Sequence, residues 1–126
     1  MTEEKQQFLT EKARQVRNLA LDGIYAAQSG HPGGSFSAAD IITYLYFDKL
    51  NVDPQNPTMD SRDRFVLSKG HCCPALYAAL AMRGFFDVSE MQSLRKLGAL
   101  LQGHPDMKTI PGIDMSTGSL GQGVSA

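Results

Sequence analysis

The chain has 126 residues, of which 42% are hydrophobic and 20% are charged, and its formal net charge is −1. This composition is ordinary for a globular protein of one domain or part of one. A net charge near zero argues against a nucleic-acid or anionic-membrane partner, and no apolar stretch approaches the roughly 20 residues needed to cross a bilayer. The N-terminus is polar and differs from a signal peptide, so we expect a cytoplasmic protein.

The first helix is predicted from about residue 3 to residue 29. Apolar or small residues recur there every three or four positions, which indicates one buried stripe and one solvated face. Gly30 supplies a stop and Pro32 prevents continuation. His31 is therefore expected in a stiff loop just past a helix C-terminus.

The second helix is predicted to begin at Ser37, with Asp40 three residues later in a spacing that resembles a capping box. Residues 41–47 are apolar nearly all round, which indicates a helix buried on most sides by a larger domain or a subunit interface. Residues 51–63 carry prolines, Asp and Asn, which is typical of a loop.

A strand, a turn and a helix are predicted next. Residues 64–68 form a short apolar run that is consistent with a buried strand, residues 69–71 form its exit turn, and residues 72–82 form a helix that ends at Gly84. This order is the geometry of an α/β layer, in which ligands collect at the carboxyl ends of strands. His71 is placed at such an end.

The last third of the chain is expected to be mostly irregular. Ser89, with Gln92, predicts a helix as far as about Leu97. Residues 98–117 read as a long loop, with a short strand at residues 114–116, and a loop of this length is usually functional or packed on a neighbour.

Cys72 and Cys73 are adjacent and are the only two cysteines. Neighbouring cysteines rarely pair, and no second ligand pair with zinc spacing is present. We therefore expect small buried thiols at the start of a helix.

Each of the three histidines follows a glycine, and a glycine-rich stretch begins at Gly118. Imidazole can donate to an anion, shuttle a proton or ligate a metal, and glycine-loop amides can contact phosphate oxygens. The chain contains neither a P-loop nor a nucleophile elbow. Taken singly each histidine has a structural alternative, as a loop hydrogen-bonder, but the shared loop context favours a functional site.

Four ordered motifs resemble the N-terminal part of transketolase, particularly the kind that is split into separate N- and C-terminal polypeptides. They are SGHPGG at 29–34, DRFVLSKGH at 63–71, GHPD at 103–106 followed by TIPGID, and TGSLGQG at 117–123. The resemblance implies an α/β, three-layer thiamine diphosphate-binding fold with a mainly parallel sheet, incomplete in this chain. Residues 1–126 would then be the N-terminal portion of a single diphosphate-binding domain.

The same resemblance implies roles for five residues. His31 and His104 match the sugar-facing catalytic histidines, the first assisting proton transfer at the substrate hydroxyls and the second binding the donor near its first carbons. His71 matches the histidine that contacts the cofactor diphosphate. Gly118 and Leu120 match residues of the loop that lines the cofactor.

The cofactors that the resemblance implies are thiamine diphosphate and Mg²⁺, and the substrates are sugar phosphates. The family's metal motif would lie beyond Ala126, so we predict no metal ligand in this chain. The activating glutamate belongs to a pyrimidine-binding domain, so we expect a C-terminal transketolase subunit or domain as partner, an oligomer, and no activity from this chain alone. Two alternatives stay open: another thiamine diphosphate enzyme of sugar metabolism, and a truncated non-catalytic binding module.

Overall fold

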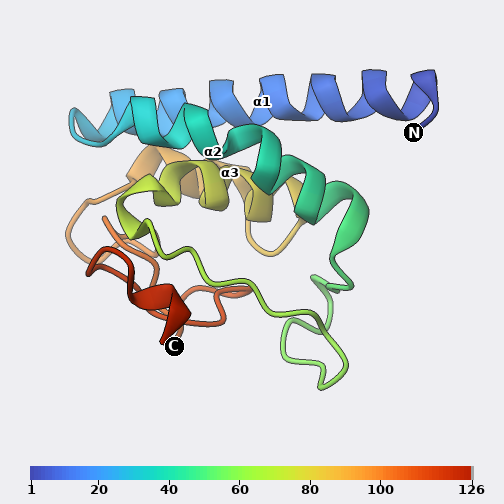
Figure 1. Ribbon diagram of the computed structural model, residues 1–126. Coiled ribbons are helices and arrows are strands. Elements are labelled where there is room, and N and C mark those ends of the chain that lie inside the picture. Colours follow the sequence, from blue (N-terminus) through green and yellow to red (C-terminus); the bar gives the residue numbers. More distant parts are fainter. Residues whose placement is uncertain (126) are drawn as a thin grey trace.

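The computed structural model describes residues 1–125, so Ala126, the last residue of the predicted domain and of its glycine-rich tail, lies outside the described residues. Three α-helices form the framework: α1 (Glu3–Ala27), α2 (Pro32–Tyr44) and α3 (Cys73–Arg83). Figure 1 shows α1 and α2 side by side above α3, with the irregular segments below. Each of the three helices contacts the other two.

Four short helical turns complete the described elements. The turn η1 (Leu45–Lys49) is a π-helical continuation of α2, whereas the other three are 3₁₀ turns. These are η2 (Gly70–Cys72), η3 (Val88–Ser93) and η4 (Gln122–Val124). No helix in residues 1–125 is long and apolar enough to span a bilayer.

Helix α1 confirms the first predicted helix. The Thr2 hydroxyl caps it by accepting the Lys5 N–H at 3.3 Å, and its buried stripe packs on the other helices. The stripe consists of Ala13, Val16, Ala20, Gly23 and Ile24. The helix ends at Gln28, which has a left-handed φ of 50° and donates its N–H to the last carbonyls. Helix α1 therefore ends before Gly30, the residue predicted to stop it.

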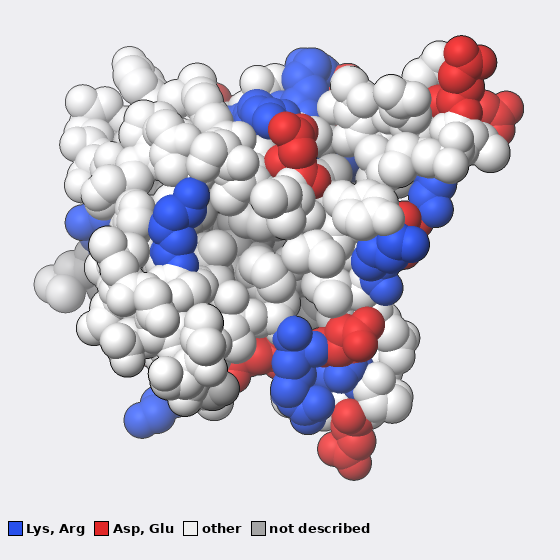
Figure 2. All heavy atoms as spheres, viewed as in Figure 1, with Lys and Arg blue, Asp and Glu red and all other residues white. Residues whose placement is uncertain are grey.

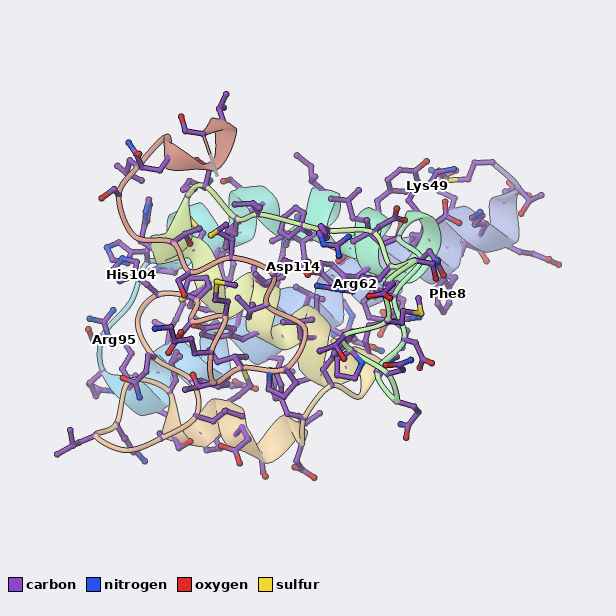
Figure 3. All side chains as sticks on the ribbon, turned by 90° about the horizontal axis from the view of Figure 1, so that it is seen from below. Phe8, Lys49, Arg62, Arg95, His104 and Asp114 are labelled. Carbon is purple, nitrogen blue, oxygen red and sulfur yellow. The ribbon has the colours of Figure 1, made fainter. Side chains whose placement is uncertain are left out.

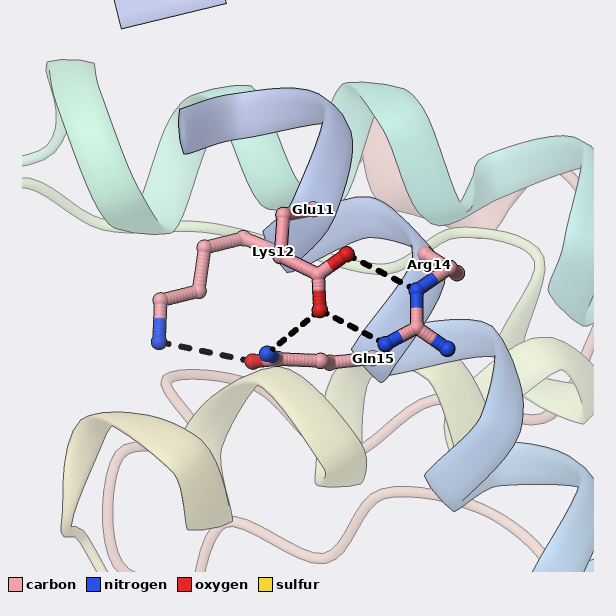
Figure 4. A network of polar contacts seen from close by, with 4 residues as sticks. All are labelled: Glu11, Lys12, Arg14 and Gln15. Carbon is pink, nitrogen blue, oxygen red and sulfur yellow. Dashed lines mark hydrogen bonds and ion pairs between the residues drawn. The ribbon is translucent and has the colours of Figure 1, made fainter. Parts of the chain in front are cut away.

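The solvent face of α1 carries a local polar network, which Figure 4 shows. Glu11 accepts from the Arg14 guanidinium at 2.7 and 2.8 Å and from the Gln15 amide at 2.8 Å, while Lys12 donates to Gln15 at 3.5 Å. The bonds from Arg14 and Gln15 lower the pKa of Glu11 to about 2. Contacts within one helix face of this kind confirm that these charges form a solvated surface.

Helix α2 begins at Pro32, so the predicted start at Ser37 is wrong. Proline has its φ preset and needs no N–H partner in the first turn, which lets a helix start directly after His31. The Ser37 hydroxyl instead donates to the Gly34 carbonyl at 3.0 Å, inside the helix. Within residues 1–125 Ile41 is 64% exposed, so burial of α2 on most sides by a larger domain or a subunit interface stays a prediction.

Helix α3 is the centre of the core and confirms the third predicted helix to within one residue at each end. All residues from Cys73 to Ala81 are buried, because α1 and α2 cover this helix. Pro74 occupies its first turn, and Gly84 ends it with a φ of 92°. An alanine-rich helix of this kind lets its neighbours pack closely.

The predicted strands are not formed, since residues 1–125 contain no strand. Residues 64–68, yellow-green in Figure 1, run beneath the helices without a partner strand. The Phe65 N–H donates to the Asp114 carboxylate at 2.9 Å, so a side chain takes the place of a ladder bond. A strand requires a neighbouring backbone at ladder spacing, and neither 64–68 nor 114–116 has one here. The described residues therefore do not confirm the mainly parallel sheet.

The helix predicted from Ser89 to Leu97 is also wrong in length and in cap. The Asp87 carboxylate accepts the Ser89 N–H at 2.8 Å and starts η3, which ends at Ser93. Arg95 then adopts a left-handed φ of 62°, which turns the chain away. An aspartate two residues earlier than expected caps the element, and the following backbone cannot continue it.

The surface mixes both signs of charge. On the face in Figure 2 acidic groups lie beside basic ones. Arg17 on α1 pairs with Asp40 on α2 at 3.0 and 2.6 Å, and Arg62 pairs with Asp114 at 3.0 Å. This distribution agrees with the near-neutral composition.

Candidate functional site

Two of the three histidines meet directly. The rings of His31, which precedes α2, and His71, in η2, are arranged edge to face with centroids 4.9 Å apart and planes at 70°. His31 is exposed and His71 is half-buried, so both can reach a bound molecule. Two segments far apart in the sequence thus supply one imidazole pair.

Gly34 allows this approach. A Cβ at that position would overlap the Cys72 sulfur and would lie 3.7 Å from Nε2 of His71. Lys69 bridges the same two segments, since its ammonium donates to the Ser37 hydroxyl at 3.1 Å and to the Gly34 carbonyl at 3.5 Å. The first turn of α2 is therefore tied to the turn that carries His71.

The glycine-rich loop packs on the other side of that turn. A Cβ at Gly70 would lie 2.6 Å from the Thr117 hydroxyl oxygen and 3.2 Å from the Gly118 nitrogen, so only glycine permits the contact. The Gly123 N–H donates to the Ser68 hydroxyl at 3.0 Å and holds the far end of the loop. Residues 68–70 thus support residues 117–123.

His104 lies against the same loop. Its ring carbons are 3.9 Å from the position of a Cβ at Gly118, and the Pro105 carbonyl accepts the Thr117 N–H at 3.3 Å. Figure 3 shows the exposed His104 side chain beside the loops seen from below. Gly118 is therefore next to both the His71 turn and His104.

Leu120 lies on this loop and is 65% exposed. The described residues therefore bring together His31 with His71, and His104 with Gly118, and leave Leu120 at the edge. A hollow of about 380 Å³ is lined by residues 115–119, 122 and 123 of the loop. It offers room for a ligand on the backbone of Gly118.

Three polar residues at these junctions were not singled out from the sequence. Ser68 and Lys69 join the segments, and Thr117 has a buried hydroxyl oxygen with no hydrogen-bond partner. All three lie inside the quoted motifs SKGH and TGSLGQG, which is the signal that could have identified them. An unpaired buried hydroxyl is uncommon and marks a place where a further partner would be favourable.

The two thiols confirm the expectation of small buried side chains. The Cys73 thiol donates to the Gly103 carbonyl at 3.2 Å, and the Tyr77 hydroxyl donates to the Gln102 carbonyl at 3.0 Å. Burial raises the pKa of Cys73 to about 12 and also raises the pKa of Cys72. Neutral thiols are poor nucleophiles, so Cys73 serves to hold the segment before His104 on α3.

Among residues 1–125, no group of three or more His, Cys, Asp or Glu side chains could hold a metal ion. A cavity of about 430 Å³ lies between residues 57–62 and 107–114, and it includes none of the three histidines. The chemistry that the described site offers is therefore imidazole hydrogen bonding and proton transfer beside exposed backbone amides.

Known proteins match this chain along most of its length. The family described as "Transketolase, thiamine diphosphate binding domain" matches residues 9–126. The chain is 48% identical over 123 residues to the 6-deoxy-6-sulfo-D-fructose transketolase subunit SqwG of Clostridium sp. (strain MSTE9), which covers 98% of this chain and 45% of that protein. It is 43% identical over 109 residues to one of the subunits of apulose-4-phosphate transketolase from Phocaeicola vulgatus, covering 86% of this chain and 38% of that protein.

Solved structures of transketolases also match this chain. The transketolase from Leishmania mexicana superposes with a TM-score of 0.87 at 34% identity, covering 93% of this chain and 18% of that one. The transketolase from Campylobacter jejuni gives 0.86 at 40% identity, covering 94% and 19%. The chain thus spans less than half the length of each of these proteins.

Proposed function

Because the chain belongs to the transketolase family, within its thiamine diphosphate-binding domain, we propose that it works as the N-terminal part of an enzyme that moves a two-carbon ketol unit from a ketose phosphate to an aldose phosphate. Residues 1–126 would form the N-terminal portion of the diphosphate-binding domain. A second polypeptide or domain would supply the pyrimidine side of the site. The names of two relatives, both of them transketolase subunits, support a divided enzyme, and an oligomer follows from this proposal.

The observation that carries the proposal is that the turn carrying His71 contacts both the His31 ring and, through Gly70, the glycine-rich loop on which His104 also lies. His31 lies against His71, and His104 lies against Gly118. Imidazoles beside free backbone amides suit a phosphorylated ligand whose hydroxyl protons must be moved.

The residues present fit a diphosphate. The buried Thr117 hydroxyl has no hydrogen-bond partner. Because residue 70 is a glycine, no side chain lies between this hydroxyl and the turn that carries His71. In this proposal His71 and the Gly118 backbone hold the diphosphate, and Leu120 packs against the rings. Thiamine diphosphate supplies the electron sink for cleavage of the carbon–carbon bond, so the protein's own work is binding and proton transfer.

His31 and His104 face the donor sugar in this proposal. His104 would donate hydrogen bonds near the first carbons of the ketose, which orients the bond to be broken. His31 would move a proton at a substrate hydroxyl, for which an exposed imidazole next to a second ring is well placed.

Mg²⁺ belongs to the proposal only as an ion held outside this sequence, because the family's Gly-Asp-Gly motif does not occur in residues 1–126. The parallel sheet is likewise proposed for the whole domain. Support comes from residues 64–68, an apolar segment whose backbone has no partner strand among the described residues. A cytoplasmic location stays a prediction.

The test is calorimetric titration with thiamine diphosphate and Mg²⁺, first of this chain and then of the chain together with a candidate C-terminal partner. We expect binding after completion, and a loss of about 10- to 100-fold in affinity for His71→Ala, as for one hydrogen bond to a charged group. His104→Ala should keep cofactor affinity and lose donor turnover. Unchanged affinity in His71→Ala would contradict its role, and no binding in any arrangement would favour a non-catalytic module.

A further inference from the structure

The loop that carries His104 is anchored on both sides, by different means. Before His104, the Gln102 and Gly103 carbonyls accept from Tyr77 and Cys73 of the buried helix α3. After His104, Pro105 and Ile110 are buried, and hydrogen bonds join residues 105–107 to another loop. The bonded residues there are 116–117, the entry to the glycine-rich loop.

Asp106 is the centre of this second anchor. Its carboxylate accepts the Ser116 hydroxyl at 3.2 Å, the Lys108 N–H at 3.0 Å and the Thr109 hydroxyl at 3.1 Å. The Ser116 oxygen in turn accepts the Met107 N–H at 2.9 Å. One carboxylate thus closes its own turn and reaches across to the other segment.

The charge of Asp106 fixes the direction of these bonds. The backbone N–H of Lys108, followed by the Thr109 and Ser116 hydroxyls, lowers the pKa of Asp106. An ionised carboxylate only accepts, so the Ser116 hydroxyl must donate to it, which leaves the Ser116 lone pairs for the Met107 N–H. Bonds to a charged acceptor are also stronger than neutral ones.

We propose that Asp106, acting through Ser116, is a positioning residue that holds His104 against Gly118. The inference rests on the proposed function for its catalytic meaning, because His104 is there the donor-binding imidazole and Gly118 the backbone at the diphosphate. The positioning of His104 against Gly118 by Asp106 and Ser116 does not depend on that function. Removing Asp106 would leave the loop attached to α3 through Cys73 and Tyr77 and to Thr117 through the Pro105 carbonyl, but would remove the Ser116 bond that fixes the segment after His104.

The test begins with NMR of this chain labelled at histidine and glycine. The His104 ring carbons lie 3.9 Å from where a Cβ at Gly118 would be, so a His104 Hδ2 to Gly118 Hα nuclear Overhauser effect is expected. Asp106→Ala and Ser116→Ala each remove the Asp106–Ser116 bond and should strongly weaken this signal, and the contact between the His31 and His71 rings should persist.

Asp87→Ala is the matched control, because Asp87 also accepts a backbone N–H two residues ahead, that of Ser89 at 2.8 Å, but caps η3 away from the site. It should leave the His104 signals unchanged. If Asp106→Ala does not fold, Ser116→Ala alone decides. A retained His104–Gly118 contact in the folded Ser116→Ala chain would overturn the proposal.

Kinetics of the completed enzyme separate this inference from the proposed function. A misplaced His104 should lower kcat with the donor ketose by roughly 10- to 100-fold, as for a displacement near 1 Å. Cofactor affinity should change little. Loss of the NMR contact without any loss of donor turnover would keep the positioning role and overturn the catalytic role assigned to His104.

Discussion

The contact between the His71 turn and the glycine-rich loop can be tested by adding one methyl group. In Gly70→Ala the new Cβ would lie 2.6 Å from the Thr117 hydroxyl oxygen and 3.2 Å from the Gly118 nitrogen. Gly70 is buried and is not among the glycines with positive φ, so the effect is one of space alone. Forcing a group into a packed site typically costs about 1–3 kcal/mol. At roughly 4 °C per kcal/mol, Tm should fall by about 4–12 °C.

The assay is thermal and urea unfolding followed by circular dichroism, with Gly33→Ala as the control. A Cβ at Gly33, in the first turn of α2, meets nothing within 4 Å, so that variant should be as stable as the parent or more stable by up to about 1 kcal/mol. Equal Tm values for Gly70→Ala and the parent chain would refute the close approach.

A second variant identifies the atom responsible. Thr117→Ala removes a buried hydroxyl that has no partner, so on its own it should cost little. Combined with Gly70→Ala, it should recover part of the loss, with a coupling energy of about 0.5 kcal/mol or more. If the two changes in unfolding free energy simply add, the Thr117 hydroxyl is not the group with which the new Cβ collides.

Three further predictions concern the core. Burial raises the pKa of Cys72 and brings that of Cys73 to about 12, so neither thiol should react with iodoacetamide at pH 8 to 9 in the folded chain, although both should react in urea. Because the folded pKa of Cys73 is above the unfolded value, the associated stability is complete below about pH 9 and falls as pH rises toward 12, which a urea-unfolding series should show. Gly112→Ala should destabilise strongly, since its φ is 83° and a Cβ would lie 2.6 Å from the Phe85 ring and 2.8 Å from Leu80; a Tm equal to that of the parent chain would contradict this packing.

The helices could be predicted from the sequence because each has a strong local signal. Periodicity over residues 3–29 gave α1, and proline with a following glycine bracketed α3. The start of α2 was missed because a serine with a plausible capping spacing competes with a proline that needs no cap. The end of η3 was missed because Arg95 takes a left-handed φ that no sequence rule assigns to arginine.

The strands could not be predicted reliably, because a strand depends on its neighbours. Residues 64–68 have the apolar composition of a buried strand, yet the described residues offer no backbone beside them. The Asp114 carboxylate takes the Phe65 N–H instead. Composition indicates what a segment can pair with and says nothing of whether the pairing strand is within reach.

Some residues of the candidate site could be identified from the sequence and others could not. The histidines and Gly118 stand out in the sequence through their glycine neighbours and through the family motifs. Asp106 and Lys69 also lie inside those motifs, but the sequence assigns them no role, because their importance arises from segments that meet only in the folded chain. A sequence can mark the groups that do chemistry, whereas the groups that orient them become visible through contacts.

At each place where two segments of this site meet, a glycine makes the close approach possible. The imidazoles come from separate loops, and loops approach one another closely only where no Cβ intervenes, as at Gly34 under Cys72 and at Gly123 beside Ser68. In such contacts the glycine backbone of one segment packs directly on a side chain of the other, which restricts their relative movement. The pairing of His31 with His71 is therefore made by packing between two segments of this chain. A site arranged in advance spends less binding energy on ordering its own groups, which leaves more for orienting a substrate.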